Sequence, residues 1–571
     1  MRQTLIIGLF QLKCTMSLSD HLFLGNLVLD LHQTTAIRWL LLLSALIAYG
    51  SLTIPVIRQL SETTDDAIQV TDSFYYWKGD VVSNPRHPPF LAAIQGLALG
   101  LEARDPVFPS PKLYSVADRA GEFRRLNPDR YFDWVIKCRW VVWFFGLGIG
   151  LLIAYFLSGF GLAVFGVGLF LWALDPTLGA FSTQSLADVP SAFWFLAALL
   201  FHQKSAKPRF TPGIFQGLLV AAAVTTKFHT AFLIPWLGAS TVLRKDLSTG
   251  GKYRYLAGMM AGLALGTALV YLPGTLAIPD HPNPLRLMLL GFQDLHNLYR
   301  EKYPLLFLGV LSDRHHPLYF PAAYLLKNPT TLLLLTAGGL LAVARDKSGI
   351  SPVLSWCFPV FLAFMLPAHN MGVRYLLPIQ TIAILLAAET AGRWVSGPGR
   401  RRVKWAVLTA GLVFQLIFVI KAAPDLIGYF NESVPPDRRI WLLGDSNLDI
   451  GQETYRAAAA LQGHHWSNLV ALQHSAPALR DLGFNSRPWE AGDFDKPDPE
   501  RVYVMNAAFA QTAQFYNPAI ETILHSWLGR TAPSGHLSDT WWYYRFDQNG
   551  RLIQDEPRLK PLDFPELRIT H

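Results

Sequence analysis

Apolar runs without charge recur along the chain, and most are about as long as a helix needs to cross a bilayer. The first extends from Trp39 to Ile57, and a longer one, from Trp140 to Leu174, carries no charge at all. A turn at Ser158-Gly159-Phe160-Gly161 is expected to divide that longer run into two helices. Further spans are expected at about 188–203, 210–243, 254–273, 318–343, 352–367, 374–391 and 404–422. The pattern predicts an α-helical polytopic membrane protein.

Basic clusters orient the predicted helices, because short loops rich in Lys and Arg stay on the inner side. Both flanks of segment 210–243 are basic: Lys204, Lys207 and Arg209 precede it, and Arg244, Lys245, Lys252 and Arg254 follow it. The segment is therefore expected to cross twice, with a break at Thr226-Lys227-Phe228-His229 near the outer side. Two further inner clusters are Arg345 with Lys347 and Arg400-Arg401-Arg402 with Lys404. The count gives about eleven spans, with the N-terminus inside.

The spans divide the chain into three parts. Residues 1–35 form an unassigned N-terminal extension, and residues 36–422 form a transmembrane body with long external loops at 59–132 and 274–317. Residues 423–571 contain no further span. Strand-like pieces there (Val502 to Met505, Trp541 to Phe546) alternate with a helix-like piece (Gln452 to Leu461), which predicts an exported soluble α/β domain.

Composition supports the membrane interpretation and removes several function classes. The 571 residues are 51% hydrophobic and only 16% charged, whereas soluble domains average about 25% charged residues. The net charge of +8 lies in short clusters between apolar runs, so no nucleic-acid partner is expected. Cys14, Cys138 and Cys357 are too scattered for a disulfide framework or a zinc motif. No glycine-rich nucleotide loop follows a predicted strand, so no nucleotide cofactor is expected. The adjacent pairs His315-His316 and His464-His465 are not spaced as metal ligands at i, i+4, so no metal ion is expected either.

Acidic residues stand at two outer helix ends. Ionisable groups near a membrane are costly, so they are functional candidates by default. Asp65-Asp66 follows the first span, where a carboxylate could act as a general base toward a hydroxyl group. A solvated pair that caps a loop helix is the simpler alternative. Asp188 stands at the outer mouth of the fourth span, where helix capping explains it equally well.

Three cations are expected at the outer side of the same spans: Lys227, Lys327 and Arg374. Each could hold a lipid-linked phosphate through charge-assisted hydrogen bonds. Each could equally extend its charged end to the interface, as long basic side chains do.

Short motifs recur in an order that is characteristic of one family. They are Asp65-Asp66-Ala67 through Tyr76, Asn84-Pro85-Arg86-His87-Pro88-Pro89, Leu186-Ala187-Asp188, Thr226-Lys227, Tyr319-Phe320-Pro321, Lys327-Asn328-Pro329, Asn370 with Arg374-Tyr375-Leu376-Leu377-Pro378, Tyr429-Phe430-Asn431-Glu432 and Asp445-Ser446-Asn447-Leu448-Asp449-Ile450-Gly451-Gln452. In this order, over roughly residues 37 to 546, the chain resembles GT-C glycosyltransferases of the dolichyl-phosphate-mannose-protein mannosyltransferase type, in their bacterial polyprenyl-phosphate-sugar form. It departs from the family pattern at Asp66 and Arg86, where Glu is usual, and at Ile450, where Trp is usual.

The resemblance implies a mechanism and a location. An inverting enzyme would move a hexose or pentose from a polyprenyl-phosphate donor to a hydroxyl of a protein, lipid or glycan acceptor, at the outer face of a bacterial plasma (inner) membrane. Asp65 would be the base, Asp66 would orient it, and Asp188 would be the second acidic position. The donor phosphate would be held by Lys227, Arg374, Arg86, His87 and Lys327.

Alternatives remain for the protein and for its last motif. A polytopic transporter or lipid flippase would place substrate residues near the bilayer midplane and usually contain a helical repeat, and neither is found. An assembly scaffold would need fewer spans than eleven. Asp445 and Asp449 are left open between catalysis and structure. A structural role is favoured, with Asn447 and Asp449 capping a helix that begins near Gln452.

Overall fold

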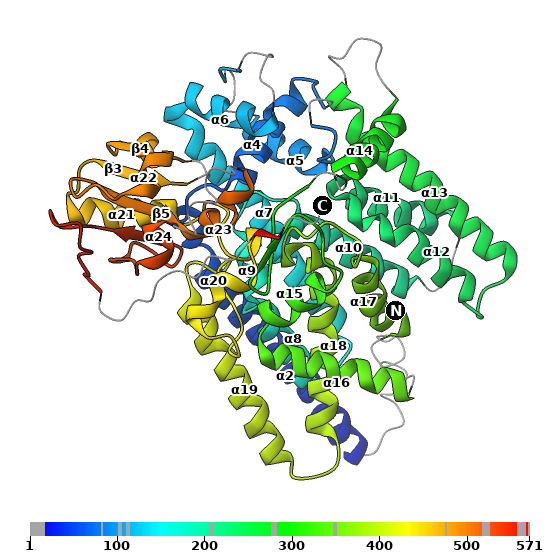
Figure 1. The fold of residues 1–571 in the computed structure, drawn as a ribbon. Coiled ribbons are helices and arrows are strands. Elements are labelled where there is room, and N and C mark those ends of the chain that lie inside the picture. The colour runs from blue at the N-terminus through cyan, green and yellow to red at the C-terminus, as the bar shows by residue number, and fades with distance from the viewer. Residues whose placement is uncertain are drawn as a thin grey trace.

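The computed structural model describes residues 18–81, 84–100, 106–109, 115–205, 209–275, 283–298, 300, 302–346, 351–473, 477–516, 526–556 and 567–568. Residues 1–17, Lys207 and Lys347 lie outside the described residues. Helices dominate the described chain, with a sheet to one side of the helical body (Figure 1). The chain is therefore mostly α-helical, as predicted.

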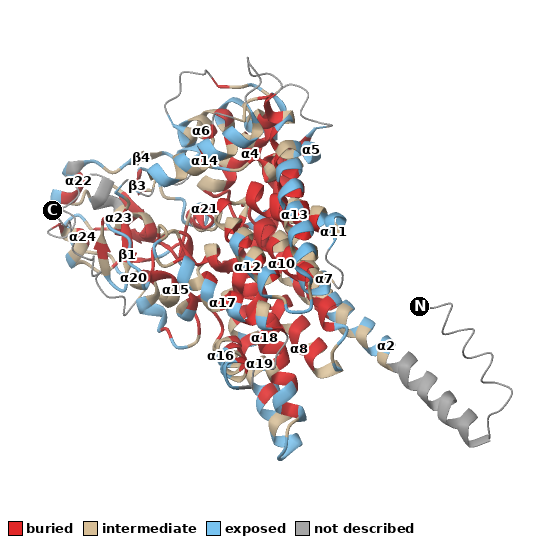
Figure 2. Cartoon of the chain, turned by 90° about the vertical axis from the view of Figure 1, so that its right-hand side faces the viewer, coloured by how far each residue is buried: buried red, intermediate tan, exposed pale blue. Residues whose placement is uncertain are grey.

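The centre of the helical body is α18 (Leu377–Ser396), which is buried along most of its length (Figure 2). Its sequence is rich in Ala, Ile and Leu on every side, and a helix that is apolar all round is stable only when neighbours surround it. The neighbours that pack against it include α8 (Leu162–Ala173), α10 (Asp188–Lys204), α16 (Thr330–Asp346) and α17 (Pro352–Phe364).

Helices coincide with all of the expected spans, but they differ in length. Within the described residues, four stretches are long and apolar enough to cross a membrane: Thr34–Gln59 in α2 (Leu18–Thr53) and α3 (Val56–Gln59), α7 (Pro128–Leu157), Val373–Ser396, and α19 (Arg401–Ala422). The bent pair of α8 and α9 (Pro176–Ser182) makes five if it counts as one span. The other expected spans fall on shorter or less apolar helices, so the count of eleven stays a prediction.

Two predicted helix breaks are confirmed and one was missed. Helix α7 ends at Leu157 and α8 begins at Leu162, around the predicted glycine turn. The segment 210–243 breaks at Lys227, between α11 (Phe210–Thr226) and α12 (Leu233–Leu243). The expected single span at 318–343 is wrong, because it is divided into α15 (Tyr319–Lys327) and α16. Pro329 is the physical reason, since proline disfavours helical geometry in the preceding residue.

Helix α13 (Thr249–Tyr271) packs against α11 at unusually short range. A Cβ atom on Gly217 would lie 2.0 Å from the backbone oxygen of Met259, so only glycine fits there. Small residues allow this close approach in membrane helices, where van der Waals packing rather than the hydrophobic effect drives association. The contact fixes the end of α11 and therefore the position of Lys227.

Four amphipathic or short helices cover one end of the bundle, at the top of Figure 1: α4 (Thr64–Trp77), α5 (Phe90–Leu99), α6 (Val116–Leu126) and α14 (Pro284–Leu298). Helix α4 packs on α5 and α6, and α14 packs on α13. A hairpin of β1 (Leu305–Phe307) and β2 (Val310–Ser312), with β8 (Leu567–Arg568) beside β2, follows α14. Apart from β8, these elements belong to the two predicted external loops.

The C-terminal region contains a five-stranded mixed sheet in the order β4-β3-β5-β7-β6. Its strands are β3 (Leu469–Leu472), β4 (Ser486–Pro488), β5 (Val502–Asn506), β6 (Gly535–His536) and β7 (Trp541–Tyr544). Its longer helices are α21 (Thr454–His464) and α23 (Ala507–Tyr516). The two predicted strands and the predicted helix are therefore present, each within three residues of its expected bounds. Shorter helical elements among the described residues are η1 (Phe228–Phe232), η2 (Pro273–Thr275), η3 (Val373–Leu376), η4 (Pro436–Arg438), α20 (Arg439–Leu442), η5 (Asp445–Asn447), η6 (Leu479–Leu482), α22 (Ala491–Asp495) and α24 (Trp527–Arg530).

The sheet shares its core with the helical body. Along β5, Val502 and Val504 belong to a small cluster under α21, whereas Tyr503 and Met505 belong to the large cluster that includes the helices. This is the alternation expected of a strand that is buried on both faces. Hydrogen bonds also join the two parts, because Ser61 Oγ donates to the backbone oxygen of Gly451 at 2.6 Å. The start of α4 is thereby fixed against the segment that precedes α21.

Candidate active site

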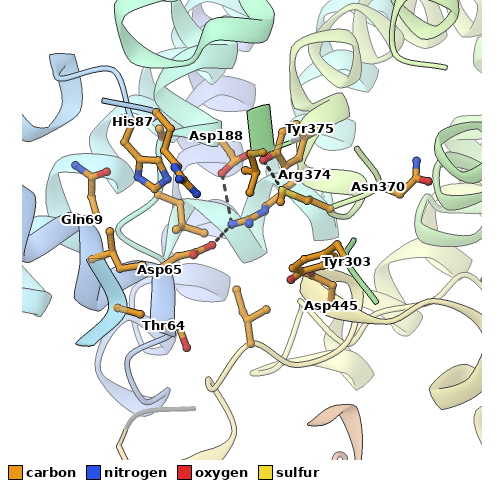
Figure 3. Close-up of a pocket in the computed structure, with 18 of the residues that line it drawn as sticks. Thr64, Asp65, Gln69, His87, Asp188, Tyr303, Asn370, Arg374, Tyr375 and Asp445 are labelled. Carbon is orange, nitrogen blue, oxygen red and sulfur yellow. Dashed lines mark hydrogen bonds and ion pairs between the residues drawn. The ribbon is translucent and has the colours of Figure 1, made fainter. Parts of the chain in front are cut away.

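A cavity of about 720 Å³ lies where the outer helices, the body and the C-terminal region meet (Figure 3). Its polar lining includes Asp65, Arg86, His87, Asp188, Lys227, Arg374 and Asp445. Seven of the sequence motifs thus contribute to one cavity, although they are spread over more than half of the chain. Of the eight predicted site residues, only Asp66 and Lys327 do not line it.

The two adjacent acids at the start of α4 have different environments. Asp66 is the third residue of the helix and forms a capping box: its carboxylate accepts from the Thr63 backbone N–H at 2.9 Å, and its own N–H donates to Thr63 Oγ1 at 3.0 Å. Asp65, the second residue, is left to point into the cavity, with 29% of its side chain exposed. One acid therefore builds the helix end and the other faces the cavity.

Asp66 also forms a fully buried ion pair. Arg139 Nη2 lies 2.6 Å from its Oδ2, and neither side chain has any exposed surface. The same guanidinium donates to the backbone oxygens of Ile57, Leu60 and Ser61, which form the connection between the first span and α4. Asp66 therefore does not line the cavity. Asp66 positions Asp65 indirectly, through the backbone of the first turn of α4.

Four charges from four helix ends form a compact cluster in the cavity. Arg374 Nη1 donates to Asp65 Oδ2 at 2.5 Å and lies 3.9 Å from Asp188 Oδ2. Lys227 Nζ donates to the other oxygen of Asp188. Asp65 and Asp188 are in the first turns of α4 and α10, where the helix macrodipole favours acids. The cluster is an alternating row of two carboxylates and two cations, of which Figure 3 labels Asp65, Arg374 and Asp188.

Backbone breaks place both cations. Lys227 is in extended conformation between α11 and η1, and its Nζ lies 3.6 Å from the centroid of the Tyr375 ring. Arg374 follows Gly372, whose φ of 106° is a left-handed value that favours glycine. A Cβ atom on Gly372 would lie 2.0 Å from Ser446 Oγ, so space as well as conformation requires glycine. The cations are therefore held in place by the fold before any ligand binds.

The electrostatics of the cluster keep Asp65 ionised. Burial raises the pKa of its carboxyl, but the charge and hydrogen bond of Arg374 outweigh burial, and the pKa is lowered from its ordinary value. An ionised carboxylate that faces a cavity can accept a proton from a hydroxyl group. It is a weaker base while Arg374 is paired with it than it would be without that cation.

Arg86 and His87 line the cavity from the loop between α4 and α5. Arg86 Nε donates to Asp294 Oδ2 on α14 at 2.9 Å, and both side chains are about one-third exposed. The residue that departs from the family pattern is thus paired with an acid from the other external segment. His87 stands next to Asp65, close enough to interact with its charge.

Lys327 does not reach the cavity. Its Nζ donates to the backbone oxygens of Ile427 at 2.7 Å and Asn447 at 2.6 Å, and the residue is 3% exposed. It therefore joins α15 to the C-terminal region, and the expected contact with a donor phosphate is wrong for this structure. The sequence predicts Lys327 at the outer side with the other cations. In the structure it is the last residue of α15, and its side chain contacts the backbone of later segments.

Asp445 and Asp449 lie at the cavity wall, although the sequence favoured a structural role for both. Tyr303 donates its hydroxyl to Asp445 Oδ2 at 2.9 Å. Asp449 accepts from Asn506 Nδ2 at 2.8 Å and from the Gly451 backbone N–H at 2.7 Å. The expected capping role is wrong, because α21 begins only at Thr454 and no side chain caps it. Within the described residues, no group of three or more His, Cys, Asp and Glu side chains is placed to hold a metal ion.

No protein-family profile matches the sequence, and no curated protein matches it. Several solved structures are distantly similar. ArnT from Cupriavidus metallidurans bound to undecaprenyl phosphate is 12% identical, with a TM-score of 0.44, over 84% of this chain and 94% of that one. Its apo state is 14% identical, with a TM-score of 0.44, over 85% and 95%.

An archaeal protein is also similar. The oligosaccharyltransferase AglB from Archaeoglobus fulgidus, in complex with an inhibitory peptide and a dolichol-phosphate, is 11% identical, with a TM-score of 0.39, over 90% of this chain and 74% of that one. Identities and TM-scores in this range describe distant similarity. The function proposed below therefore rests on the residues of the cavity.

Proposed function

We propose that this protein is a glycosyltransferase that moves a sugar, with inversion, from a polyprenyl-phosphate donor to an acceptor hydroxyl. The observation that carries the proposal is the cluster in which Asp65, ionised and facing the cavity, lies 2.5 Å from Arg374 and next to the pair of Lys227 and Asp188. A base and two phosphate-binding cations are thus present in one cavity. The motifs that resemble those of the GT-C family contain the same four residues.

The chemistry assigns one role to Asp65. It accepts the proton of the acceptor hydroxyl while that oxygen attacks the anomeric carbon from the face opposite the phosphate. The bond from the anomeric carbon to the phosphate oxygen breaks, and its electron pair stays on the phosphate. Because a phosphate ester is a weakly basic leaving group, the second carboxylic acid that glycosidases use is not needed. A single cavity-facing base is therefore sufficient.

Lys227 and Arg374 stabilise the charge that develops on the departing phosphate. Both side chains are largely buried, with 16% and 10% exposed, so water screens their charges little. Asp188 holds the two cations at a fixed separation through its two oxygens. Arg86 and His87, on the loop above, are placed to contact the same phosphate or the first part of its lipid.

Binding of the lipid phosphate tests the proposal directly. The purified protein in liposomes should bind undecaprenyl phosphate and should bind undecaprenol, which lacks the phosphate, at least about 10-fold more weakly, because charged hydrogen bonds contribute about 1.5–3 kcal/mol each. Surface plasmon resonance or quenching of tryptophan fluorescence measures both affinities. Equal affinity for the two lipids would show that the protein does not recognise the phosphate, and would contradict the proposed site.

A second experiment tests the proposed location. We propose that the protein lies in a bacterial plasma membrane, with its active site at the outer face. Cys138 and Cys357 are buried, so single cysteines can be placed on a chain in which only Cys14 is replaced. Cysteines at Ser248 and Ser396, exposed beside the basic clusters, should resist an impermeant maleimide added outside, whereas one at Ser467 should react. Labelling at Ser248 from outside would contradict the double crossing at Lys227.

A further inference from the structure

One polar pair in the cavity has no role in the reaction described above. Asp445 and Tyr303 come from different segments, one preceding α21 and one preceding β1, and their side chains meet at 2.9 Å (Figure 3). Both line the cavity beside Arg374, and in Figure 3 they lie on the side of Arg374 opposite to Asp188. Asp445 lies within electrostatic range of both Arg374 and Asp65. The pair is therefore close to the expected position of the anomeric carbon.

Asp445 is held rigidly in this position. Its φ of 56° is a left-handed value that Asp and Asn tolerate better than other residues with side chains. The next two residues anchor the turn: Ser446 Oγ donates to the Met371 backbone oxygen at 2.6 Å, and Asn447 Oδ1 accepts from the Val373 backbone N–H at 2.9 Å. The acid is thus fixed to the same short loop that carries Arg374, and the position of one side chain relative to the other is fixed.

The chemistry of the pair suits hydroxyl groups and not a phosphate. A carboxylate repels a phosphate, and Asp188, which pairs with the cation Lys227, lies on the other side of Arg374 (Figure 3). Oδ2 accepts one hydrogen bond from Tyr303 and keeps further lone pairs, while the phenol oxygen can itself accept a hydrogen bond. Two acceptors side by side match two neighbouring hydroxyls of a sugar ring.

We infer that Asp445 and Tyr303 form a subsite that binds hydroxyl groups of the sugar being transferred. The inference rests on the proposed function and adds the part of the cavity that recognises the sugar. A sugar joined to a phosphate at Lys227 and Arg374, with its anomeric carbon facing Asp65, brings its ring past Arg374 toward this pair. The subsite would then distinguish sugar-bearing donors from the bare lipid phosphate.

The test compares bare undecaprenyl phosphate with undecaprenyl phosphate that carries glucose, galactose, mannose or arabinose. The wild-type protein should bind at least one sugar-bearing lipid more tightly than the bare lipid. Asp445→Asn keeps the volume and tolerates the left-handed backbone, and Tyr303→Phe removes only the hydroxyl. Each should reduce this preference, by about 10-fold for the acid and less for the phenol, without weakening the binding of the bare lipid.

Asp437→Asn, an exposed acid on η4, is the matched control and should keep the full preference. Either of two results would overturn the inference: a wild type that binds no sugar-bearing lipid more tightly than the bare one, or a preference that survives in both variants. An equal loss of affinity for every lipid would also overturn it, since that is the effect of a general structural change. Failure of the wild type to bind even the bare lipid would instead refute the proposed function.

Discussion

Asp65→Asn should lower the rate of sugar transfer by about 10²–10⁴, the usual loss when a general base is removed. The substitution keeps the volume of the side chain and removes the carboxylate that can accept the hydroxyl proton. It also releases Arg374 from its 2.5 Å ion pair, so binding of undecaprenyl phosphate should be unchanged or tighter. Transfer from a labelled polyprenyl-phosphate sugar in membranes measures the rate, and binding to the purified protein measures the affinity.

Asp66→Asn is the matched control, one residue further along the same helix turn. Asp66 is fully buried against Arg139, and breaking such a pair by removing one charge costs about 3–5 kcal/mol. This variant should therefore have a lower thermal midpoint, while the transfer rate of the protein that remains folded falls much less than in Asp65→Asn. The mechanism would be refuted if membranes that contain the Asp65→Asn protein transferred sugar at the wild-type rate.

The contrast between the two acids could have been predicted from local sequence. Thr63 stands three residues before Asp66, and this spacing is that of a capping box in which the third helical residue folds back on the cap. The same rule leaves the second residue, Asp65, facing outward. The break at Lys227 was predicted for a similar reason, because charge on both flanks of one apolar segment is visible in the sequence alone.

The role of the last motif could not be predicted in this way. Asp445 reaches the cavity because its segment is hydrogen-bonded to the loop around Gly372 and, further along, because Ser61 bonds to Gly451, 390 residues away. No periodicity or spacing indicates such contacts between distant segments. Lys327 shows the opposite case, since a cation expected in the site is used to hold backbone oxygens of residues about 100 and 120 positions later. Fold class and charge placement follow local rules, whereas the composition of the cavity wall depends on tertiary packing.

Arg374→Ala should weaken the binding of undecaprenyl phosphate by about 1.5–3 kcal/mol, the range for a hydrogen bond to a charged group. Lys227→Ala should have an effect of similar size, because both cations face the cavity from opposite sides of Asp188. Lys245→Ala removes an exposed cation that follows α12 and does not line the cavity, so it should leave binding unchanged. Undiminished affinity in both cavity variants would return these residues to a purely structural role.

The Arg374 variant should also change the pH dependence of transfer, in a direction that the ion pair determines. In the wild type, Arg374 is the cation that lowers the pKa of Asp65, so the base stays ionised to a pH below its ordinary range. Without that cation, burial dominates and the pKa of Asp65 rises. Because only the ionised carboxylate can accept a proton, the acid limb of kcat/KM should move to higher pH in Arg374→Ala. Arg374→Lys, which keeps the charge, should lie closer to the wild type. An acid limb at the same pH in Arg374→Ala and the wild type would show that Asp65 is not the group whose ionisation limits the reaction.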